Sequence, residues 1–363
     1  MSGAALSLVE NLNDFFRAKN YTRIEPPVLQ PTGVFTELSG EDIRRRLFVT
    51  QDRAGHDLCL RPEYTIPVAL ELLKRTAEPS GAFYYLGPVF RSRSDGPGEF
   101  LQAGTESIGR VDRSAADAEC VVHALKALSY MDVTHSSVVF GDMALLGAVL
   151  NALGLTAAAV RRVVASLITG TSLESLDTGD VSMHEKHASL LAAIENQDSR
   201  AVTAFIEDVF AIAGVSRIGG RSVHDIAERF LAKASNRSAL TPAQRESLSR
   251  FLAIRGEPDE AVEAVRAFAG ETGLDIDSAL SDLETRIGFL AALNADLSQF
   301  RFEAGFARNL DYYTGFIFEV FSPLHPEPVA GGGRYDSLFR QLGAGSDIPA
   351  VGCAFHLNRL TGG

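Results

Sequence analysis

Cysteine is scarce in this sequence, which has three in 363 residues. Cys59, Cys120 and Cys353 stand far apart, and no two of them form a CxxC pair. This spacing argues against a zinc ribbon or a redox motif, so we expect no metal site. Isolated thiols of this kind are typical of small buried hydrophobic side chains in a reducing compartment.

Long apolar runs are also missing. No segment has the length needed to span a bilayer, and Met1–Leu12 lacks the basic start and apolar run of a signal peptide. Hydrophobic residues make up 46% of the chain and charged residues 22%, as in an ordinary globular protein. We therefore expect a cytoplasmic protein with no membrane partner.

Basic residues are fewer than acidic residues in this sequence. The chain has 34 lysines and arginines against 46 aspartates and glutamates, which gives a formal net charge of -12. Nucleic-acid binders normally present a basic face to the phosphates. The acidic balance therefore argues against tRNA as a partner.

The two ends of the chain read as one sheet domain. Between Arg46 and Gly109, short apolar strands alternate with turn residues, which favours a mostly antiparallel sheet. Strand-forming residues return after Phe300, above all in Phe316–Phe321. We predict an α+β fold in which residues 1–142 and 294–363 build a single domain of antiparallel sheet flanked by helices.

The middle of the chain has a different composition. Alanine and leucine dominate residues 143–293, and strand-forming residues thin out. Leu280, Leu283, Ile287 and Leu290 recur at helical spacing and mark an amphipathic helix. We predict that residues 143–293 form a mainly helical insertion in the sheet domain.

Polar residues suited to a small zwitterion gather in three segments. Gln102, Gly104 and Glu106 alternate, so they share one face of a strand. Carboxylates suit an α-ammonium group or an imidazole N–H, and an arginine suits a carboxylate or a phosphate. The segments are Arg61–Thr65, Tyr85–Glu106, and Arg308–Gly315 with Gly331–Asp336.

These segments resemble the catalytic core of histidyl-tRNA synthetase, a class II aminoacyl-tRNA synthetase. The Arg-Asn-Leu-Asp-Tyr-Tyr-Thr-Gly run at Arg308–Gly315 is similar to the histidine-specific motif of that family, and Gly-Gly-Gly-Arg-Tyr-Asp at Gly331–Asp336 also matches. Ile24–Leu29 resembles the class II dimer-interface motif, which implies a homodimer with Tyr21–Leu29 at its two-fold interface. The resemblance covers roughly Leu6–Met143 and Phe300–Leu360.

The resemblance implies a role for each matching position. Glu63, Thr65 and Gln102 match residues that hold the histidine α-amino group, whereas Glu106 and Tyr313 match residues that bond its imidazole. Tyr312 belongs to the same histidine-binding set, and Arg308 matches the arginine near the histidine carboxylate. Arg91 and Arg359 match the two arginines that hold ATP phosphates.

Departures from the synthetase pattern concern ATP and tRNA. The Ser92–Leu101 loop is shorter than the family's and is acidic or neutral where the family is basic. The third class II motif carries His356 where the family has a glycine against the purine, so the nucleotide would be crowded. The histidine-specific motif has Asn309 in place of glycine. No C-terminal anticodon-binding domain is expected after Gly363.

Intact histidine positions with eroded ATP and tRNA positions resemble the regulatory subunits of ATP phosphoribosyltransferase, which are histidyl-tRNA synthetase paralogues. This resemblance implies a subunit with no catalytic residues and no cofactor. Its partner would be a short-form catalytic subunit that condenses ATP with phosphoribosyl pyrophosphate and is inhibited by histidine, the first step of histidine biosynthesis. Whether histidine binds in the ancestral pocket or at a subunit interface stays open.

An enzyme is the alternative reading. A minimal ligase could activate histidine with ATP, as the synthetase does. The damaged loop, His356 and the missing anticodon-binding domain argue against it. A tRNA-binding module is disfavoured by the charge.

Overall fold

The computed structural model describes residues 3–39, 41–93, 96–171, 240–308, 312–323 and 325–360. Asn309 and two residues of the Ser92–Leu101 loop, at positions 94 and 95, lie outside these ranges. The chain divides into two compact units, Met1–Val149 with Arg250–Gly363, and Leu150–Ser249. Each unit is described by itself.

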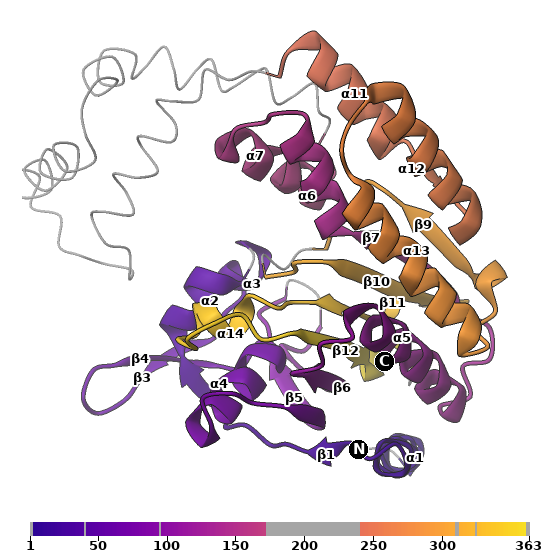
Figure 1. Ribbon diagram of the computed structural model, residues 1–363. Helices are drawn as coiled ribbons and strands as arrows, with labels where there is room; N and C mark the ends of the chain where they lie inside the picture. The colour runs from indigo at the N-terminus through magenta and orange to yellow at the C-terminus, as the bar shows by residue number, and fades with distance from the viewer. Residues whose placement is uncertain are drawn as a thin grey trace, which may run out of the picture. The chain divides into compact units, whose positions relative to one another are not determined.

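The first unit contains a mixed sheet of nine strands that is antiparallel apart from two pairs (Figure 1). The parallel pairs are β1 with β5 and β7 with β9. This arrangement confirms the predicted α+β fold. In spatial order the strands are β1 (Thr22–Arg23), β5 (Gly81–Phe90), β6 (Glu99–Ile108), β12 (Ala350–His356), β11 (His325–Arg334), β10 (Phe316–Ser322), β7 (Ser137–Asp142), β9 (Phe300–Glu303) and β8 (Arg255–Gly256).

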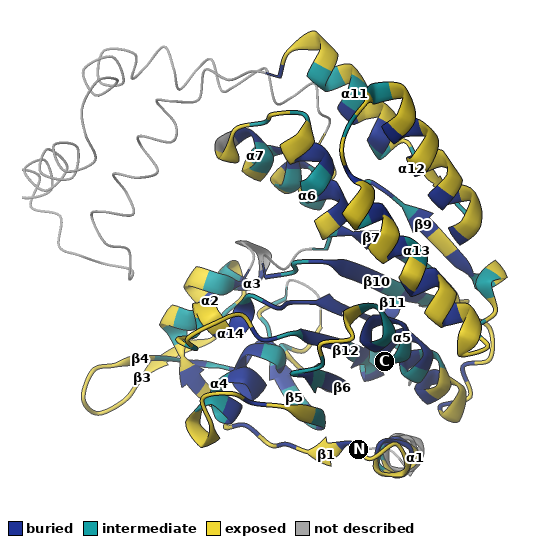
Figure 2. Ribbon diagram, viewed as in Figure 1, coloured by how far each residue is buried: buried dark blue, intermediate teal, exposed yellow. Residues whose placement is uncertain are grey.

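Helices α5 (Arg113–Tyr130) and α13 (Asp277–Ala292) pack against each other, and α5 contacts β6, β10, β11 and β12. The leucines and isoleucine of α13 are buried at the predicted spacing, which confirms its amphipathic pattern. Figure 2 shows this helix and α12 (Pro258–Thr272) with one buried and one exposed side. Helix α1 (Gly3–Ala18) also packs on α5.

A second core lies on the other side of the large sheet. It includes Phe35, Ile66, Tyr85 and Leu338. Around it are helices α2 (Thr32–Leu38), α3 (Glu41–Arg45), α4 (Thr65–Arg75) and α14 (Leu338–Gln341), with a three-stranded sheet of β2 (Leu29–Pro31), β4 (Asp57–Leu60) and β3 (Val49–Gln51).

The Tyr21–Leu29 segment connects strands of two different sheets. Thr22–Arg23 pairs with β5 at the edge of the large sheet, and Leu29–Pro31 pairs with β4 in the small one. Pro26 and Pro27 stand between them, and proline has no N–H to donate to a strand ladder. The chain therefore passes from one sheet to the other at the prolines.

The described part of the second unit is helical. It comprises the end of α6 (Met143–Ala152), α7 (Ala157–Thr169) and most of α11 (Pro242–Leu252). Thr156 caps α7 through its side chain, which accepts from the backbone N–H of Ala159, and Gly170 ends the helix at φ 66. The division of the chain at 143 and 293 stays a prediction, because residues 172–239 are outside the described ranges. No described helix has the length and hydrophobicity needed to cross a membrane.

Candidate functional site

A cavity of about 290 Å³ lies on the sheet face opposite α5. Alternation along the strands brings Gln102, Gly352 and Gly331 to this face. The cavity is lined by every residue that the sequence assigned to histidine or ATP except Glu106. Those lining residues are Glu63, Thr65, Arg91, Gln102, Arg308, Tyr312, Tyr313 and Arg359.

Glycines form the floor of the cavity because functional side chains lie directly on them. A Cβ added to Gly352 would stand 1.7 Å from the Glu106 carboxylate, and one added to Gly104 would stand 2.2 Å from the Tyr85 hydroxyl. At Gly331 the nearest atom is a guanidinium nitrogen of Arg308, at 2.8 Å. Backbone without side chains therefore makes room for these groups.

Glu106 lies just beneath the lining, and only 1% of it is exposed. The Thr65 hydroxyl donates to one carboxylate oxygen at 2.8 Å, and the Tyr335 hydroxyl donates to the other. Burial raises the pKa of Glu106 to about 8, although both hydrogen bonds act to lower it. The carboxyl group is therefore mostly protonated at pH 7 in the ligand-free protein.

Glu63 is fixed at the start of α4. Its two carboxylate oxygens accept from the backbone N–H groups of Thr65 at 2.6 Å and Ile66 at 2.9 Å. These bonds satisfy two backbone N–H groups that have no acceptor within the first turn of the helix. Burial raises the pKa of Glu63, and the two bonds oppose that rise. Glu63 thus has both a structural partner and a place on the cavity wall.

Gln102 and His356 face each other on neighbouring strands and both line the cavity. The Gln102 Oε1 atom is buried and has no hydrogen-bond partner among the described residues. Burial, with the charges of Arg359 and Arg91, lowers the pKa of His356 well below its usual value. His356 is therefore a neutral imidazole beside a free acceptor.

Arginines gather at one end of the cavity. Arg308 donates to Glu319 at 3.2 Å and to the Tyr313 hydroxyl at 3.0 Å. Arg91 donates to the Pro62 carbonyl oxygen at 2.7 Å. Arg359 contacts the Pro328 carbonyl oxygen and the exposed Glu327. The cavity wall thus combines arginines with carboxyl and hydroxyl groups.

Comparisons with known proteins show the family of the chain. The histidyl-tRNA synthetase family matches residues 2–218 and 221–360. An ATP phosphoribosyltransferase regulatory subunit from Chelativorans sp. is 38% identical over 98% of this chain and 96% of its own length. One from Rhizobium etli is 39% identical over 95% of this chain and 94% of its own.

The chain belongs to the family of ATP phosphoribosyltransferase regulatory subunits. It is therefore a regulatory, non-catalytic member of the histidyl-tRNA synthetase fold, as the sequence predicted.

Solved structures show the same fold for this regulatory subunit. An ATP phosphoribosyltransferase regulatory subunit/histidyl-tRNA synthetase from Bacillus halodurans aligns with a TM-score of 0.70 at 20% identity, covering 98% of this chain and 78% of that one. Histidyl-tRNA synthetase from Nostoc sp. aligns at 0.66 and 17% identity, covering 99% of this chain and 70% of that one. These likenesses support the class II architecture.

Sequence reasoning missed several residues of the regulatory subunit's cavity. Tyr335 stands in the recognised Gly331–Asp336 motif, yet its contact with Glu106 was not assigned. Tyr85 and Glu319 were given no role, and the structure pairs them with Gly104 and Gly331, contacts that depend on strand register. His356 was read only as an obstacle to ATP, whereas it also lines the cavity.

Proposed function

We propose that this regulatory subunit binds histidine in the glycine-floored cavity and passes the signal to a short-form ATP phosphoribosyltransferase catalytic subunit. The carrying observation is that arginines line one small cavity together with carboxyl and hydroxyl groups. A zwitterionic amino acid needs both. Small-molecule sites are concave and hold a few placed polar groups, as this cavity does.

The pose of histidine follows from the charges. Its carboxylate faces Arg308, and its α-ammonium group donates to the unpartnered Gln102 oxygen and to Glu63. Its imidazole N–H donates to Glu106, whose carboxylate the Thr65 and Tyr335 hydroxyls hold in place. Tyr312 and Tyr313 complete the wall around the ligand.

The partner supplies the chemistry. The family name implies a catalytic subunit of ATP phosphoribosyltransferase, so the condensation of ATP with phosphoribosyl pyrophosphate occurs on that subunit. Histidine then acts through a coupling free energy between its cavity and the catalytic subunit. We place this complex in the cytoplasm and assign it no tRNA partner, in keeping with the net charge of -12.

A homodimer through the class II interface is part of the proposal. Leu29 is 50% exposed on β2 and Val49 is 58% exposed on β3, with Val28 and Phe48 beside them in sequence. These two strands flank β4 in the small sheet. Leu29 and Phe48 lie across from Leu60 on either side and so share one face of the small sheet, and exposed apolar side chains on one face mark a protein interface.

The test uses the full chain with its catalytic partner. The two proteins should co-purify in fixed stoichiometry, and calorimetry should show histidine binding to the regulatory subunit alone. Histidine-dependent exchange of pyrophosphate into ATP separates this proposal from the ligase alternative. Exchange at about 1 s⁻¹ or faster, as expected of an enzyme, would contradict the regulatory assignment.

A further inference from the structure

A buried carboxylate on the helix-covered face of the sheet is shared by two arginines. Asp117 on α5 is 0% exposed. One of its oxygens accepts from Arg334 Nε at 2.8 Å, and the other accepts from Arg286 Nε at 2.9 Å. Arg334 ends β11, and Arg286 lies on α13, so one side chain joins three elements.

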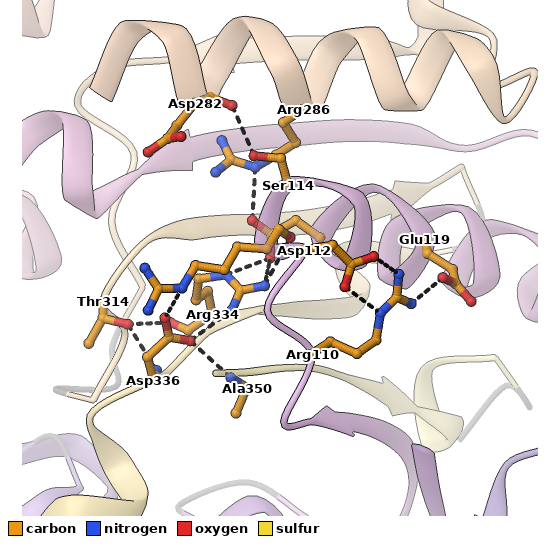
Figure 3. Close-up of polar contacts among 12 residues, drawn as sticks. Arg110, Asp112, Ser114, Glu119, Asp282, Arg286, Thr314, Arg334, Asp336 and Ala350 are labelled. Carbon is orange, nitrogen blue, oxygen red and sulfur yellow. Dashed lines mark hydrogen bonds and ion pairs between the residues drawn. The ribbon is translucent and has the colours of Figure 1, made fainter. Parts of the chain in front are cut away.

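Each arginine also has a second carboxylate. Arg286 donates to Asp142 at 2.8 Å, and Arg334 donates to Asp336 at 2.8 Å. Figure 3 shows Arg334 bonded to Asp336, which Thr314 and Ala350 also contact. Buried charges persist when they are paired and hydrogen-bonded in this manner, and such pairs fix geometry more than they add stability.

The segment after β11 connects this cluster with the cavity. The Arg334 side chain lies on the α5 face, whereas Tyr335 lines the cavity and donates to Glu106. The backbone between them is fixed on both sides. Thr314 N–H donates to the Arg334 carbonyl oxygen at 2.8 Å, and Tyr335 N–H donates to the Ala350 carbonyl oxygen at 2.8 Å.

We propose that Asp117 is a positioning residue for the histidine cavity. Through Arg334 it fixes the backbone from which Tyr335 reaches Glu106. Through Arg286 it links the same backbone to helix α13. The identity of the ligand rests on the proposed function, whereas the positioning of Tyr335 does not.

Asp117→Asn is the sharpest change. The amide keeps the shape of the carboxylate, but only one of its two ends accepts a hydrogen bond, and its NH₂ group then faces a guanidinium. Each arginine keeps its other carboxylate, but Asp117 no longer accepts from both, so Arg334 and the backbone that carries Tyr335 are held less firmly. Glu284→Gln is the matched control, because it makes the same chemical change on α13 in the partly exposed pair with Arg266.

The first readout needs no ligand. Infrared difference spectra against Glu106→Gln give the pKa of the Glu106 carboxyl, which faces Thr65 on α4, Tyr335 after β11, and Glu63. The Tyr335 hydrogen bond lowers this pKa against the larger rise from burial. In Asp117→Asn the pKa should therefore rise above that of wild type, and in Glu284→Gln it should not change.

The second readout is ligand affinity. Asp117→Asn should weaken histidine binding by about tenfold, with a smaller effect on β-(2-thienyl)alanine, which lacks ring N–H groups. A general loosening of the fold would weaken both ligands alike. If Asp117→Asn does not fold, Arg334→Lys replaces it, because a lysine keeps the charge but has no fork to bridge Asp117 and Asp336.

Shifts in both readouts, absent from Glu284→Gln, would support the inference. A folded variant with an unchanged Glu106 pKa, or with a changed pKa and unchanged histidine affinity, would overturn it. Wild-type protein that does not bind histidine would instead refute the proposed function, and the ligand-free pKa comparison would still decide whether Asp117 positions Tyr335.

Discussion

At the scale of single residues, burial and hydrogen bonding act in opposite directions on the protonation of Glu106. Its carboxyl group is enclosed by a glycine backbone and two hydroxyl groups, with no water-exposed side. Enclosure favours the neutral acid, and the hydroxyl donors favour the anion. The balance leaves its pKa at about 8, near physiological pH.

Histidine affinity should therefore depend on pH through Glu106. Losing a hydrogen bond to a charged group costs about 1.5–3 kcal/mol, or roughly ten- to a hundredfold in affinity. Glu106→Gln should weaken binding by that factor at pH 9, where the wild-type group is ionised, and by less at pH 6.5. The ratio of the two calorimetric dissociation constants cancels the titration of histidine itself. A ratio that stays constant between these pH values would contradict the assignment.

The same residue should destabilise the ligand-free fold as pH rises. In the unfolded chain Glu106 ionises near 4.5, while in the folded protein it keeps its proton until about 8. The contribution of Glu106 to the free energy of unfolding is therefore fully present below pH 4.5 and is lost as pH rises to about 8. The loss is about 1.4 kcal/mol for each unit by which the two pKa values differ. Melting temperatures from pH 5 to 8 should fall in wild type relative to Glu106→Gln. Melting temperatures that change with pH in the same way in both proteins would show that folding does not raise the pKa of Glu106.

The sequence could predict which residues line the cavity but not how deep each one lies. Motif matches picked out Glu63, Gln102 and Arg308, and all three line the cavity. Glu106 is expected to accept from the ligand, and the structure adds the hydroxyls of Thr65 and Tyr335 as donors to its two oxygens. Such depth depends on Thr65 at the start of α4 and on Tyr335 after β11, which are far apart in the sequence, so no local pattern records it.

At the scale of elements, the strands supply a floor without side chains. Gly352→Ala should abolish measurable histidine binding and lower the melting temperature, because the new Cβ would stand 1.7 Å from the Glu106 carboxylate. Gly147→Ala on α6 is the control, since nothing lies within 4 Å of that position and alanine favours helix by up to about 1 kcal/mol. Calorimetry and thermal melts measure both effects. Wild-type affinity in Gly352→Ala would show that the floor is not close-packed.

Strands and helices were largely predictable because their periodicity is local. The amphipathic pattern of α13 and the apolar run of β10 both match the structure. The order of strands in the sheet was not predictable, because β12, from the C-terminal end of the chain, pairs with β6 and β11. That pairing creates the cavity, and it depends on contacts between segments far apart in sequence.

At the scale of the whole molecule, the small sheet should hold two copies together. Leu29→Asp with Phe48→Asp should convert a dimer to a monomer, because burying two new carboxylates in an apolar interface is unfavourable. Val111→Asp is the matched control, since Val111 is 86% exposed in the loop before α5. Analytical ultracentrifugation at micromolar concentration gives the result. A double variant that remains dimeric would place the two-fold interface elsewhere.

The most direct test of the central claim compares binding with inhibition in the reconstituted complex. Arg308→Gln removes the guanidinium that faces the ligand carboxylate, so it should weaken histidine binding to the regulatory subunit by roughly ten- to a hundredfold. If this cavity is the sensor, the histidine concentration that half-inhibits the complex should rise by the same factor, with uninhibited activity unchanged. Feedback inhibition at the wild-type concentration, despite lost binding to the regulatory subunit, would contradict the account.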